Sequence, residues 1–442
     1  MIPDLVGWMF PIIFALILLG IPVAFTLIVT GFIFGCLIFD FNVWLVSIQM
    51  HDRLLDVTSN FVLAAIPLFI MMGAVLERSG LAQRLFTAIQ IWLYPVPNGL
   101  GLTTLVMCTL LAAASGVVGA VEVLVGLMAI PAMKKARYKD DLIAGTVCAG
   151  GSLGTIIPPS VLVVVYASAA DISVGDMLAG VIIPGLMMVA GFGLYILVRG
   201  FFEKKQKAPM PPEFIGMTLA QKIKLTLTAI VPTLLLIMVV LGSILTGTAT
   251  PTEAGGLGVA GAIILALFSQ GLTWRTLWQS LSQTIVVTGA ITIIIFGGVA
   301  FTSIFVIGGG KTLILDAIAA FDLSATQTLL VFLLMIFVLG FFLDWVSVIL
   351  ISIPIFAPVV RIYGIDPVWF GVLVCIMLQT SYLTPPMAPS IFYLRSIAPS
   401  DMSYRSMYLG VLPFIVIQLI VLAIVIVYPW SATYLPTVLF RL

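Results

Sequence analysis

The chain has 442 residues, of which 62% are hydrophobic and 8% are charged, and its formal net charge is +1. Soluble globular domains carry about 25% charged residues, so this composition excludes a soluble globular protein. The near-neutral charge gives no indication of a nucleic-acid partner. At about 20 residues per span, the length allows roughly ten to twelve membrane crossings. The sequence therefore predicts an all-α, polytopic (multi-pass) protein of the lipid bilayer.

The reactive side chains argue against catalysis. The single histidine, His51, cannot form a zinc site alone, and no Ser/His/Asp arrangement is visible. The cysteines lie in apolar segments without a CxxC pair and are expected to be buried free thiols; they are Cys36, Cys108, Cys148 and Cys375. We therefore expect neither an enzyme nor a cofactor.

The first hundred residues predict a series of short helices. Residues 5–39 form an apolar block that is too long for one span or for a signal peptide, and Gly20-Ile21-Pro22 divides it into two helices. Residues 41–56 are amphipathic and indicate an interfacial helix. Residues 61–76 and 81–94 are interpreted as the arms of a re-entrant hairpin, because the first arm is short for a span.

The most informative stretch is GGSLGTIIPPS, residues 150–160. A run this apolar predicts a helix, but Pro158 and Pro159 lack backbone donors and clash with the preceding turn, so the helix must break there. Inside a membrane, unwound backbone persists only where it is buried in protein or lines a cavity. The freed carbonyl groups are ligands for small cations.

The second half of the chain repeats this plan. Pro385 and Pro386 lie 227 residues after the first pair, within a second broken segment. At the same offset Pro131 corresponds to Pro358 and Tyr166 to Tyr393; residues 274–283 are expected to be interfacial and 285–307 a second hairpin arm. Two broken apolar segments at corresponding places in two halves indicate a transporter's binding site.

The loop charges indicate how the halves are oriented. Residues 134–139 are rich in lysine and arginine, as is the polar stretch 199–224, whereas the loop of the second copy that corresponds to 134–139 holds only Arg361 and Asp366. By the positive-inside rule the two basic loops are cytoplasmic and the last is periplasmic. The two repeats are therefore predicted to have inverted topology.

Several motifs in this order resemble one family, the large membrane subunit of TRAP (tripartite ATP-independent periplasmic) transporters. The similar segments are Leu63–Phe69 (LAAIPLF), Ile130–Lys135 (IPAMKK), Gly154–Ser160 (GTIIPPS), Thr250–Ala254 (TPTEA) and Gly364–Gly371 (GIDPVWFG). The resemblance covers nearly the whole chain. It implies an elevator-type permease driven by a sodium gradient, with re-entrant hairpins and broken helices.

The resemblance also implies partners and a division into parts. The partners would be a small four-helix membrane subunit, expected as a separate polypeptide, and a periplasmic substrate-binding protein, in the bacterial inner membrane. The expected parts are the first scaffold helices (1–60), the first transport repeat (61–198), a cytoplasmic linker (199–224), the second scaffold helices (225–283), the second transport repeat (284–408) and a C-terminal helix (409–442).

A first sodium site is expected at the first break. Backbone carbonyls of Gly154, Ile157 and Pro159 bracket the break, and Ser115 follows a run of small residues and would add a hydroxyl. The family pattern has a second hydroxyl two residues after this serine, where Val117 stands here. This departure leaves the site one side-chain ligand short. The alternative is that these glycines serve close helix packing.

A second sodium site corresponds to the family's second position. Its expected ligands are Gly340, Ser381, Thr384 and the carbonyl of Met387, with Thr380 as a nearby alternative. Asp344 lies within an apolar segment, where a charged side chain is costly and usually functional. It would bind a cation or pair with a basic group; the alternative is a carboxylate at a helix end.

The substrate is expected to be an organic acid. Arg395 follows the second break, and its planar guanidinium matches a carboxylate; the alternative is an interfacial arginine. Thr155, Ser160 and Ser390 would line the same cavity, whereas Glu77 and Glu122 are interpreted as scaffold or helix-end residues. The motif variants resemble the branch for 2-oxo acids, lactate-type or aromatic carboxylates more than the sialic-acid branch. The expected substrate is a 2-oxo acid, a lactate-like acid or a C4-dicarboxylate.

Three other function classes are weighed against this one. An ion channel is disfavoured because the sequence has no continuous polar stripe. An intramembrane enzyme is disfavoured because paired carboxylates and a His/Glu metal set are absent. The alternative within transporters is a stand-alone cation/anion symporter that needs no binding protein.

Overall fold

The computed structural model describes residues 2–116, 118–202, 216–269 and 271–440, and within these ranges it is helical with no strand. The all-α prediction is confirmed. The helices of the first half are α1 (Ile2–Gly7), α2 (Met9–Leu18), α3 (Val23–Ile38), α4 (Val43–Thr58), η1 (Phe61–Ala64), α5 (Ala65–Arg78), α6 (Leu81–Leu93), α7 (Gly99–Ser115), α8 (Val118–Lys135), α9 (Asp140–Ser152), η2 (Leu153–Thr155), α10 (Val161–Ala170) and α11 (Val174–Phe202). Those of the second half are α12 (Leu219–Leu245), α13 (Pro251–Phe268), α14 (Trp274–Ile307), α15 (Gly310–Ala320), α16 (Ala325–Leu339), α17 (Trp345–Ile362), α18 (Pro367–Leu383), α19 (Pro389–Ile397), α20 (Tyr404–Val427) and α21 (Trp430–Phe440).

Among the described residues, 7 helices are long and apolar enough to cross a membrane alone. They are η1 with α5, α11, α12, α13, α14, α17 and α20. This number is below the ten to twelve crossings predicted from length. The reason is that many other apolar helices have only 10–17 residues, because hairpin tips and helix breaks divide the apolar sequence into shorter pieces.

The two halves repeat the same order of helices. Adding the offset of 227 residues to the bounds of α8 gives the bounds of α17, and the same shift carries α9, α10 and α11 onto α18, α19 and α20 within a few residues. It also carries α3 onto α13 and places α5 inside α14. The predicted internal repeat is confirmed at the level of its elements.

Two equivalent residues meet each other in the middle of the molecule. The side-chain amide of Gln379 donates a hydrogen bond of 3.2 Å to the hydroxyl oxygen of Ser152, and the two positions are 227 residues apart. Both side chains are fully buried. Because equivalent positions touch, the pseudo-two-fold axis that relates the repeats passes between them.

Each repeat packs on the other. Helix α8 lies against α19 of the second half, and its equivalent α17 lies against α10 of the first. In the same way, α5 and α3 of the first half pack along α13 and α14 of the second. We call this contact of each half with the other exchanged packing. At the end of α8, Lys134 forms an ion pair of 2.7 Å with Asp401 beyond α19. Its equivalent Arg361, on α17, donates to the carbonyl of Ala170 at the end of α10 (3.0 Å).

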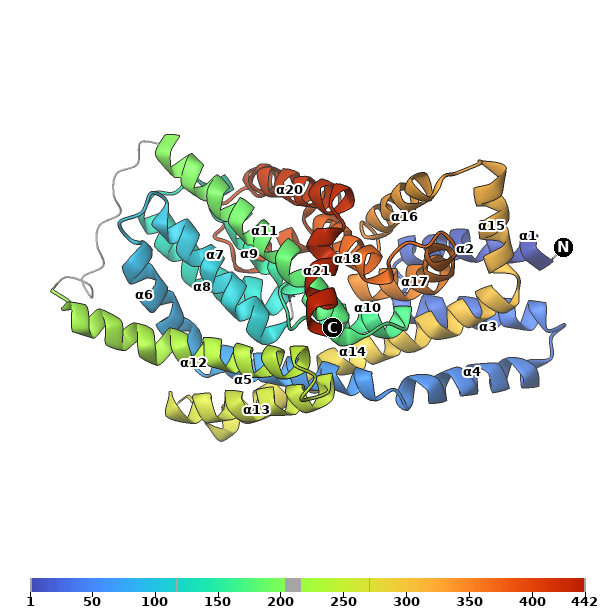
Figure 1. The fold of residues 1–442 in the computed structure, drawn as a ribbon, viewed down its shortest axis with the longest axis horizontal. Coiled ribbons are helices and arrows are strands. Elements are labelled where there is room, and N and C mark those ends of the chain that lie inside the picture. Colours follow the sequence, from blue (N-terminus) through green and yellow to red (C-terminus); the bar gives the residue numbers. More distant parts are fainter. Residues whose placement is uncertain (1, 117, 203–215, 270, 441–442) are drawn as a thin grey trace.

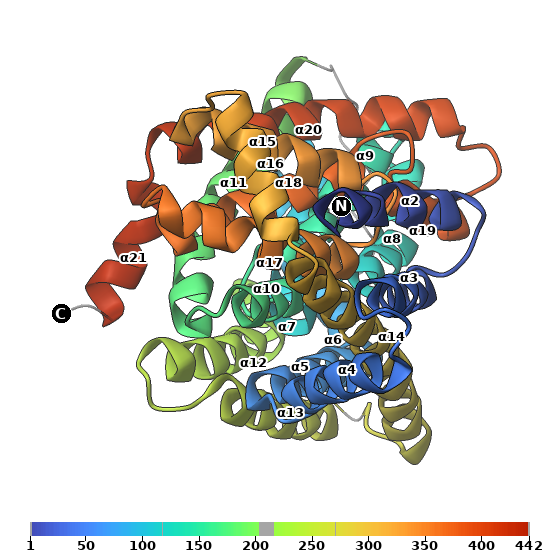
Figure 2. The ribbon, with the colours of Figure 1, turned by 90° about the vertical axis from the view of Figure 1, so that its right-hand side faces the viewer.

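The helices fall into two groups in space. Helices α4, α5, α12 and α13 lie along the lower side of Figure 1 and again at the bottom of Figure 2, with α14 running beside α5 and α3 beside α14. We call these six helices the base layer. The helices α7–α10 and α16–α19 lie above it and are called the transport body.

The structure corrects the predicted hairpins. Two antiparallel pairs with tight tips are present, α7 with α8 and α16 with α17, rather than pairs built from residues 61–94 and 285–307. The interfacial segment expected at 274–283 and the arm expected at 285–307 are one continuous helix, α14. Both true hairpins fall within the predicted transport repeats 61–198 and 284–408.

Other local predictions have mixed outcomes. The turn at Gly20-Ile21-Pro22 separates α2 from α3 as expected, and residues 43–58 form the separate helix α4. Much of the predicted linker 199–224 lies outside the described residues. Of its ends, Arg199 belongs to α11 and residues 219–224 begin α12, where Thr218 caps the helix.

Candidate functional site

The first break exposes backbone carbonyls in the protein interior. Helix α9 ends at Ser152, and the chain is not α-helical again until Val161, because prolines 158 and 159 supply no N–H groups. Thr155 donates its hydroxyl proton to the carbonyl of Ser152, and Ser160 donates to the carbonyl of Thr155, each at 2.8 Å. Each Pro–Pro bond of the two breaks is cis.

Three carbonyls of this break keep their lone pairs. In this fully described segment, no hydrogen bond reaches the carbonyl oxygens of Gly154, Ile157 or Pro159, although all three residues are buried. Buried carbonyls without donors are rare in proteins, and unwound backbone inside a membrane is tolerated where it lines a cavity or binds an ion. These are three of the predicted ligands.

The tip of the first hairpin lies on these carbonyls. Gly116 has a φ of 61°, and a Cβ built on it would be 3.1 Å from the carbonyl oxygen of Pro159. The preceding Ser115 is buried, and its hydroxyl has no hydrogen-bond partner. The structure thus places the hairpin tip next to the first break, with Gly116 against the Pro159 carbonyl and α7 packed on the η2 turn. Val117 lies outside the described residues.

Ser115 also faces the base layer. A Cβ on Gly73 of α5 would be 2.5 Å from the Cα of Ser115, so only glycine permits this approach. A small cavity of about 10 Å³ lies here, lined among others by Glu77. That volume holds about one water-sized particle, so the hairpin tip packs closely on the base layer, and Ser115 and Glu77 are the polar side chains of this mainly apolar space.

The second break offers hydroxyl oxygens. Ser381 donates its proton to the carbonyl of Leu378 at 2.8 Å, and Thr384 donates to Thr380 at 2.7 Å. Thr380 itself donates to the carbonyl of Ile376. Because each proton is directed into helix α18, each hydroxyl oxygen keeps lone pairs that can accept a cation.

The tip of the second hairpin touches this break in the same way as the first. A Cβ added to Gly340 would collide with the hydroxyl oxygen of Ser381. Gly340 and Ser381 are therefore in direct contact, as a shared cation site requires. Met387, whose carbonyl was predicted to complete the site, is 46% exposed.

Asp344 has a defined structural partner set. It is the N-cap of α17, and its Oδ2 accepts hydrogen bonds from the backbone N–H groups of Val346 (3.0 Å) and Ser347 (3.3 Å). Its Oδ1 accepts the Ser347 hydroxyl at 2.5 Å. A helix N-terminus stabilises a carboxylate, so the geometry agrees with the helix-end alternative.

The residues predicted for the substrate are not all together. Thr155 and Ser160 are buried and bonded to each other, and Ser390, also buried, donates to a carboxylate oxygen of Glu122 at 2.7 Å. Arg395 lies at the opposite end of α19 from Ser390. Its guanidinium donates to the carbonyl of Met402 (3.0 Å) and lies 5.1 Å from the ring centre of Tyr404. In this conformation Arg395 is bonded to Met402 and packed on Tyr404, away from the other three residues.

Comparison with known proteins identifies the family. The model of "Tripartite ATP-independent periplasmic transporter, DctM component" matches residues 10–431. The chain belongs to this family. It is a permease for secondary transport of organic acids, one part of a tripartite system with a small membrane subunit and a periplasmic binding protein, and it is a multi-pass membrane protein, not an enzyme.

Individual relatives carry different cargoes. The permease is 30% identical to the C4-dicarboxylate TRAP transporter large permease protein DctM of Pseudomonas aeruginosa, over 87% of each chain. It is 27% identical to the sialic acid permease SiaM of Vibrio cholerae, over 99% of this chain and 98% of that one. It is also 27% identical to the ectoine/5-hydroxyectoine permease UehC of Ruegeria pomeroyi, over 95% and 96%.

A solved structure shares the fold. The YdaH transporter of Alcanivorax borkumensis, described as having an unusual topology, aligns with a TM-score of 0.56 over 83% of the permease and 87% of that chain. At 15% sequence identity the likeness concerns the fold alone.

Sequence reasoning missed three residues of this site. Gly116 sits at the hairpin tip on the first break, Gln379 marks the repeat axis, and Glu122 is fully buried beside Ser390. Glu122 is the fifth residue of α8, one turn inside the helix rather than at its end. Its isolation in an apolar helix was the available signal.

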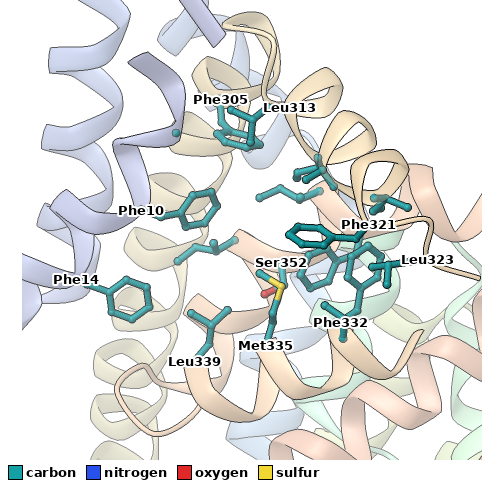
Figure 3. Close-up of a pocket in the computed structure, with 18 residues that line it drawn as sticks. Phe10, Phe14, Phe305, Leu313, Phe321, Leu323, Phe332, Met335, Leu339 and Ser352 are labelled. Carbon is teal, nitrogen blue, oxygen red and sulfur yellow. The ribbon is translucent and has the colours of Figure 1, made fainter. Parts of the chain in front are cut away.

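An apolar cavity of the permease is not suited to a carboxylate. Figure 3 shows this cavity of about 410 Å³, lined by aromatic and aliphatic side chains such as Phe10, Phe305, Phe321 and Phe332. Ser352 is the one polar side chain among its lining residues. An anion would lose its hydration there without gaining donors, so the breaks are the better candidate site.

Proposed function

We propose that the permease imports an organic acid together with sodium ions, after a periplasmic binding protein delivers the acid. The sodium ions would bind at the two breaks. The first would use Ser115 with the carbonyls of Gly154, Ile157 and Pro159. The second would use oxygens of Gly340, Ser381, Thr384 and Met387, with Thr380 nearby.

One observation carries this proposal: each hairpin tip touches a broken helix of its own repeat at a glycine. Gly116 approaches the Pro159 carbonyl, and Gly340 contacts the Ser381 hydroxyl. The Pro159 carbonyl accepts no hydrogen bond, and the Ser381 hydroxyl oxygen keeps its lone pairs because its proton is directed to Leu378. Several converging oxygens are what a small hard cation binds. Asp344, bonded as a helix cap, would add negative charge near the second site rather than a direct ligand.

The substrate is proposed to be a carboxylate of the 2-oxo acid, lactate-like or C4-dicarboxylate class. The hydroxyl groups of Thr155 and Ser160 lie in the first break, and that of Ser390 lies just after the second, bonded to Glu122. Arg395 would bind the carboxylate after releasing the Met402 carbonyl. Its guanidinium is only partly buried, which leaves room for such a change of partner.

We also propose an elevator movement of the transport body against the base layer. A cavity of about 230 Å³ lies at their boundary, with Arg53 and Ile295 on the base-layer side and Ser168 and Leu350 on the other. The hydrogen bond from Asn60 to Ser168 (2.9 Å) crosses this boundary. A boundary with free volume and neutral polar contacts can slide at lower cost than a tightly packed one.

The membrane is proposed to be the bacterial inner membrane, with the basic end of α8 on the cytoplasmic side. The partners would be a small four-helix membrane subunit and the periplasmic binding protein. The positive-inside rule supports the orientation, because Lys134 and Lys135 end α8 whereas Arg361 alone is basic in the last turn of α17.

Uptake in proteoliposomes tests this function. The permease with its small subunit would take up radiolabelled carboxylates under an inward sodium gradient, with and without the binding protein. We expect uptake to need both sodium and the binding protein. Uptake without the binding protein would establish a stand-alone symporter, and uptake driven by protons alone would refute the sodium sites.

Two variants with matched controls assign the residues. Ser381→Ala should raise the sodium concentration for half-maximal uptake, whereas Ser396→Ala, on an exposed position of α19, should not. Arg395→Ala should raise the substrate concentration needed, whereas Arg275→Ala in the exposed first turn of α14 should leave it unchanged. Equal effects of a variant and its control would contradict the assignment.

A further inference from the structure

Glu122 is a buried acid that the sodium sites do not use. Its side chain is 0% exposed and lies on α8, the second arm of the first hairpin. A Cβ on Gly151 would be 2.8 Å from the Cβ of Glu122, so a glycine lets α9 close over the carboxyl group. The acid is therefore enclosed between α8, α9 and α19.

The carboxyl group is only half satisfied. Its Oε2 accepts the Ser390 hydroxyl at 2.7 Å, while Oε1 has no hydrogen-bond partner. Ser390 also lies 3.3 Å from the carbonyl of Cys148, which links the acid to α9. In the described part of the chain, no lysine, arginine or histidine forms an ion pair with Glu122.

The titratable side chains that face Glu122 are the thiols of Cys108 on α7 and Cys148 on α9 and the phenol of Tyr382 on α18, none of which can carry a positive charge. The phenol of Tyr393 on α19 packs against Gly119 of α8 and interacts with Tyr382. Helix α6 contributes Arg84, which is solvent-exposed, and Arg395 of α19 is bonded to the Met402 carbonyl. A carboxylate here would have no countercharge.

We propose that Glu122 is a proton-binding site of the transport body, and that its proton is taken up and released as the body moves. A lone carboxylate in a membrane interior costs several kcal/mol. A sodium ion needs several converging oxygens, whereas the direct oxygen partner found here is one hydroxyl. A proton needs one oxygen, and the protonated acid can still bond to Ser390.

The contacts of Glu122 link its protonation to the packing of the first hairpin on α9 and α19. Glu122, on α8 of the first hairpin, is bonded to Ser390 on α19, the helix after the second break. Ser390 in turn lies 3.3 Å from the Cys148 carbonyl on α9, the helix before the first break. Losing the proton would leave a charge between α8, α9 and α19 that only entering water could solvate. Proton release therefore requires these helices to separate, and proton binding allows them to close.

Infrared spectroscopy of the permease, purified with its small subunit, tests the site without any transport. The difference spectrum of wild type minus Glu122→Gln should contain the carbonyl stretch of a protonated carboxylic acid, shifted in deuterium oxide. Glu77→Gln is the matched control, because Glu77 interacts with Arg78 and Gln283; it should leave this band in place. Absence of the band from the wild-type difference would overturn the proposal.

A second variant protects the test against misfolding. If Glu122→Gln does not assemble, Glu122→Asp keeps the acid with a shorter side chain. Its carbonyl band should be present but displaced in frequency, because the bond to Ser390 changes. An unchanged band in Glu122→Asp would assign it to another residue and contradict the proposal.

The transport step of this inference rests on the proposed sodium-coupled uptake and has its own readout. Substrate uptake by wild-type proteoliposomes should move protons, detected with an internal pH dye, and Glu122→Gln should take up substrate with no accompanying proton movement. Equal proton movement in wild type and Glu122→Gln would refute the proposal that Glu122 takes up and releases a proton during transport. A changed sodium dependence without a carbonyl band would make Glu122 a metal ligand instead. If wild type shows no sodium-driven uptake, the proposed function fails while the infrared result stands.

Discussion

The two breaks are equivalent in sequence but differ in exposure. Every residue from Gly154 to Ser160 is buried, whereas Pro385, Pro386 and Met387 are exposed. Ser160 and Met387 occupy equivalent positions and are 0% and 46% exposed. One molecule thus presents a closed and an open version of the same motif, and the difference shows that the second site is the accessible one in this conformation.

The two sites also differ in the chemistry of their oxygens. The proposed first site would use carbonyl groups and the Ser115 hydroxyl, with Ile157 at the position that corresponds to Thr384, whereas the proposed second site would use the hydroxyls of Ser381 and Thr384. Backbone oxygens survive any substitution that keeps the chain conformation, but hydroxyls do not. Side-chain substitutions should therefore act mainly on the second site, and backbone changes on the first.

The largest expected effect is on chemical accessibility. Met387→Cys should react with a water-soluble thiol reagent about a hundredfold faster than Ser160→Cys, because a buried group reacts only when the structure opens locally. The native cysteines are all buried, so the background should be low. Mass spectrometry measures the labelling rates of the two variants. Equal rates would show that the two breaks do not differ in their exposure to water.

The second largest effect is expected from adding one methyl group at the tip of the second hairpin. In Gly340→Ala, the new Cβ collides with the Ser381 hydroxyl, and overpacking typically costs about 1–3 kcal/mol, so the sodium concentration for half-maximal uptake should rise about tenfold or more.

The control for this substitution is the equivalent residue of the first half. Ala113→Gly removes a methyl group at the position that corresponds to Gly340, and its expected cost is about 0.5–1 kcal/mol of helix stability. Sodium-dependent uptake measured for both variants should differ strongly. A similar loss in both would mean that helix stability, rather than the Ser381 contact, governs the effect.

A moderate effect is expected from the cap of α17. Asp344→Ala removes the acceptor of two backbone N–H groups and should lower stability by about 1 kcal/mol, whereas Asp344→Asn, which can still cap, should lower it little. Asp366→Ala, at the equivalent end of α18, is the control for cap loss. Thermal unfolding measures stability, and a loss of sodium dependence in Asp344→Asn alone would show that the charge itself binds sodium.

The smallest effect concerns the ends of the hairpins. The hydrogen bond from Lys134 lowers the pKa of Asp401 below its usual range. The ion pair therefore stabilises the fold above the usual aspartate pKa of about 4, and this contribution is lost as the pH falls through the lowered value. The equivalent contact, Arg361 with the Ala170 carbonyl, has no group that titrates there.

Thermal unfolding between neutral and acidic pH checks this prediction. Asp401→Asn should reduce the loss of stability on acidification slightly, because exposed ion pairs contribute little and are screened by salt. Arg361→Gln should leave the pH dependence as in wild type. A larger change in Arg361→Gln than in Asp401→Asn would contradict the assignment.

The sequence predicted the repeat and the breaks because their causes are local. Proline removes a backbone donor wherever it stands, so Pro158–Pro159 and Pro385–Pro386 could be placed without a structure. The hairpins could not, because residues 100–133 and 329–360 are mainly apolar and contain no proline break at the tips, where the chain reverses. Only the close approach of Gly116 to the Pro159 carbonyl, and of Gly340 to the Ser381 hydroxyl, marks where each hairpin reverses direction.

The side chains of the candidate site were harder to predict than its backbone. The contact of Arg395 with the Met402 carbonyl depends on how α19 meets the following loop, and the enclosure of Glu122 depends on Gly151 and Ser390 from other helices. Such environments arise from contacts between segments far apart in the chain. Helical periodicity within α8 carries no information about them.

The exchanged packing of the repeats has a consequence for biosynthesis. Helices α5 and α8 enter the membrane while their partners α13 and α19 have yet to be translated, so the first half must wait in the bilayer with its contact surfaces facing lipid. Neither half can reach its final arrangement alone. The nascent permease therefore completes its fold only after its last third has been made, and two separately synthesised halves would have to find each other in the membrane to become active.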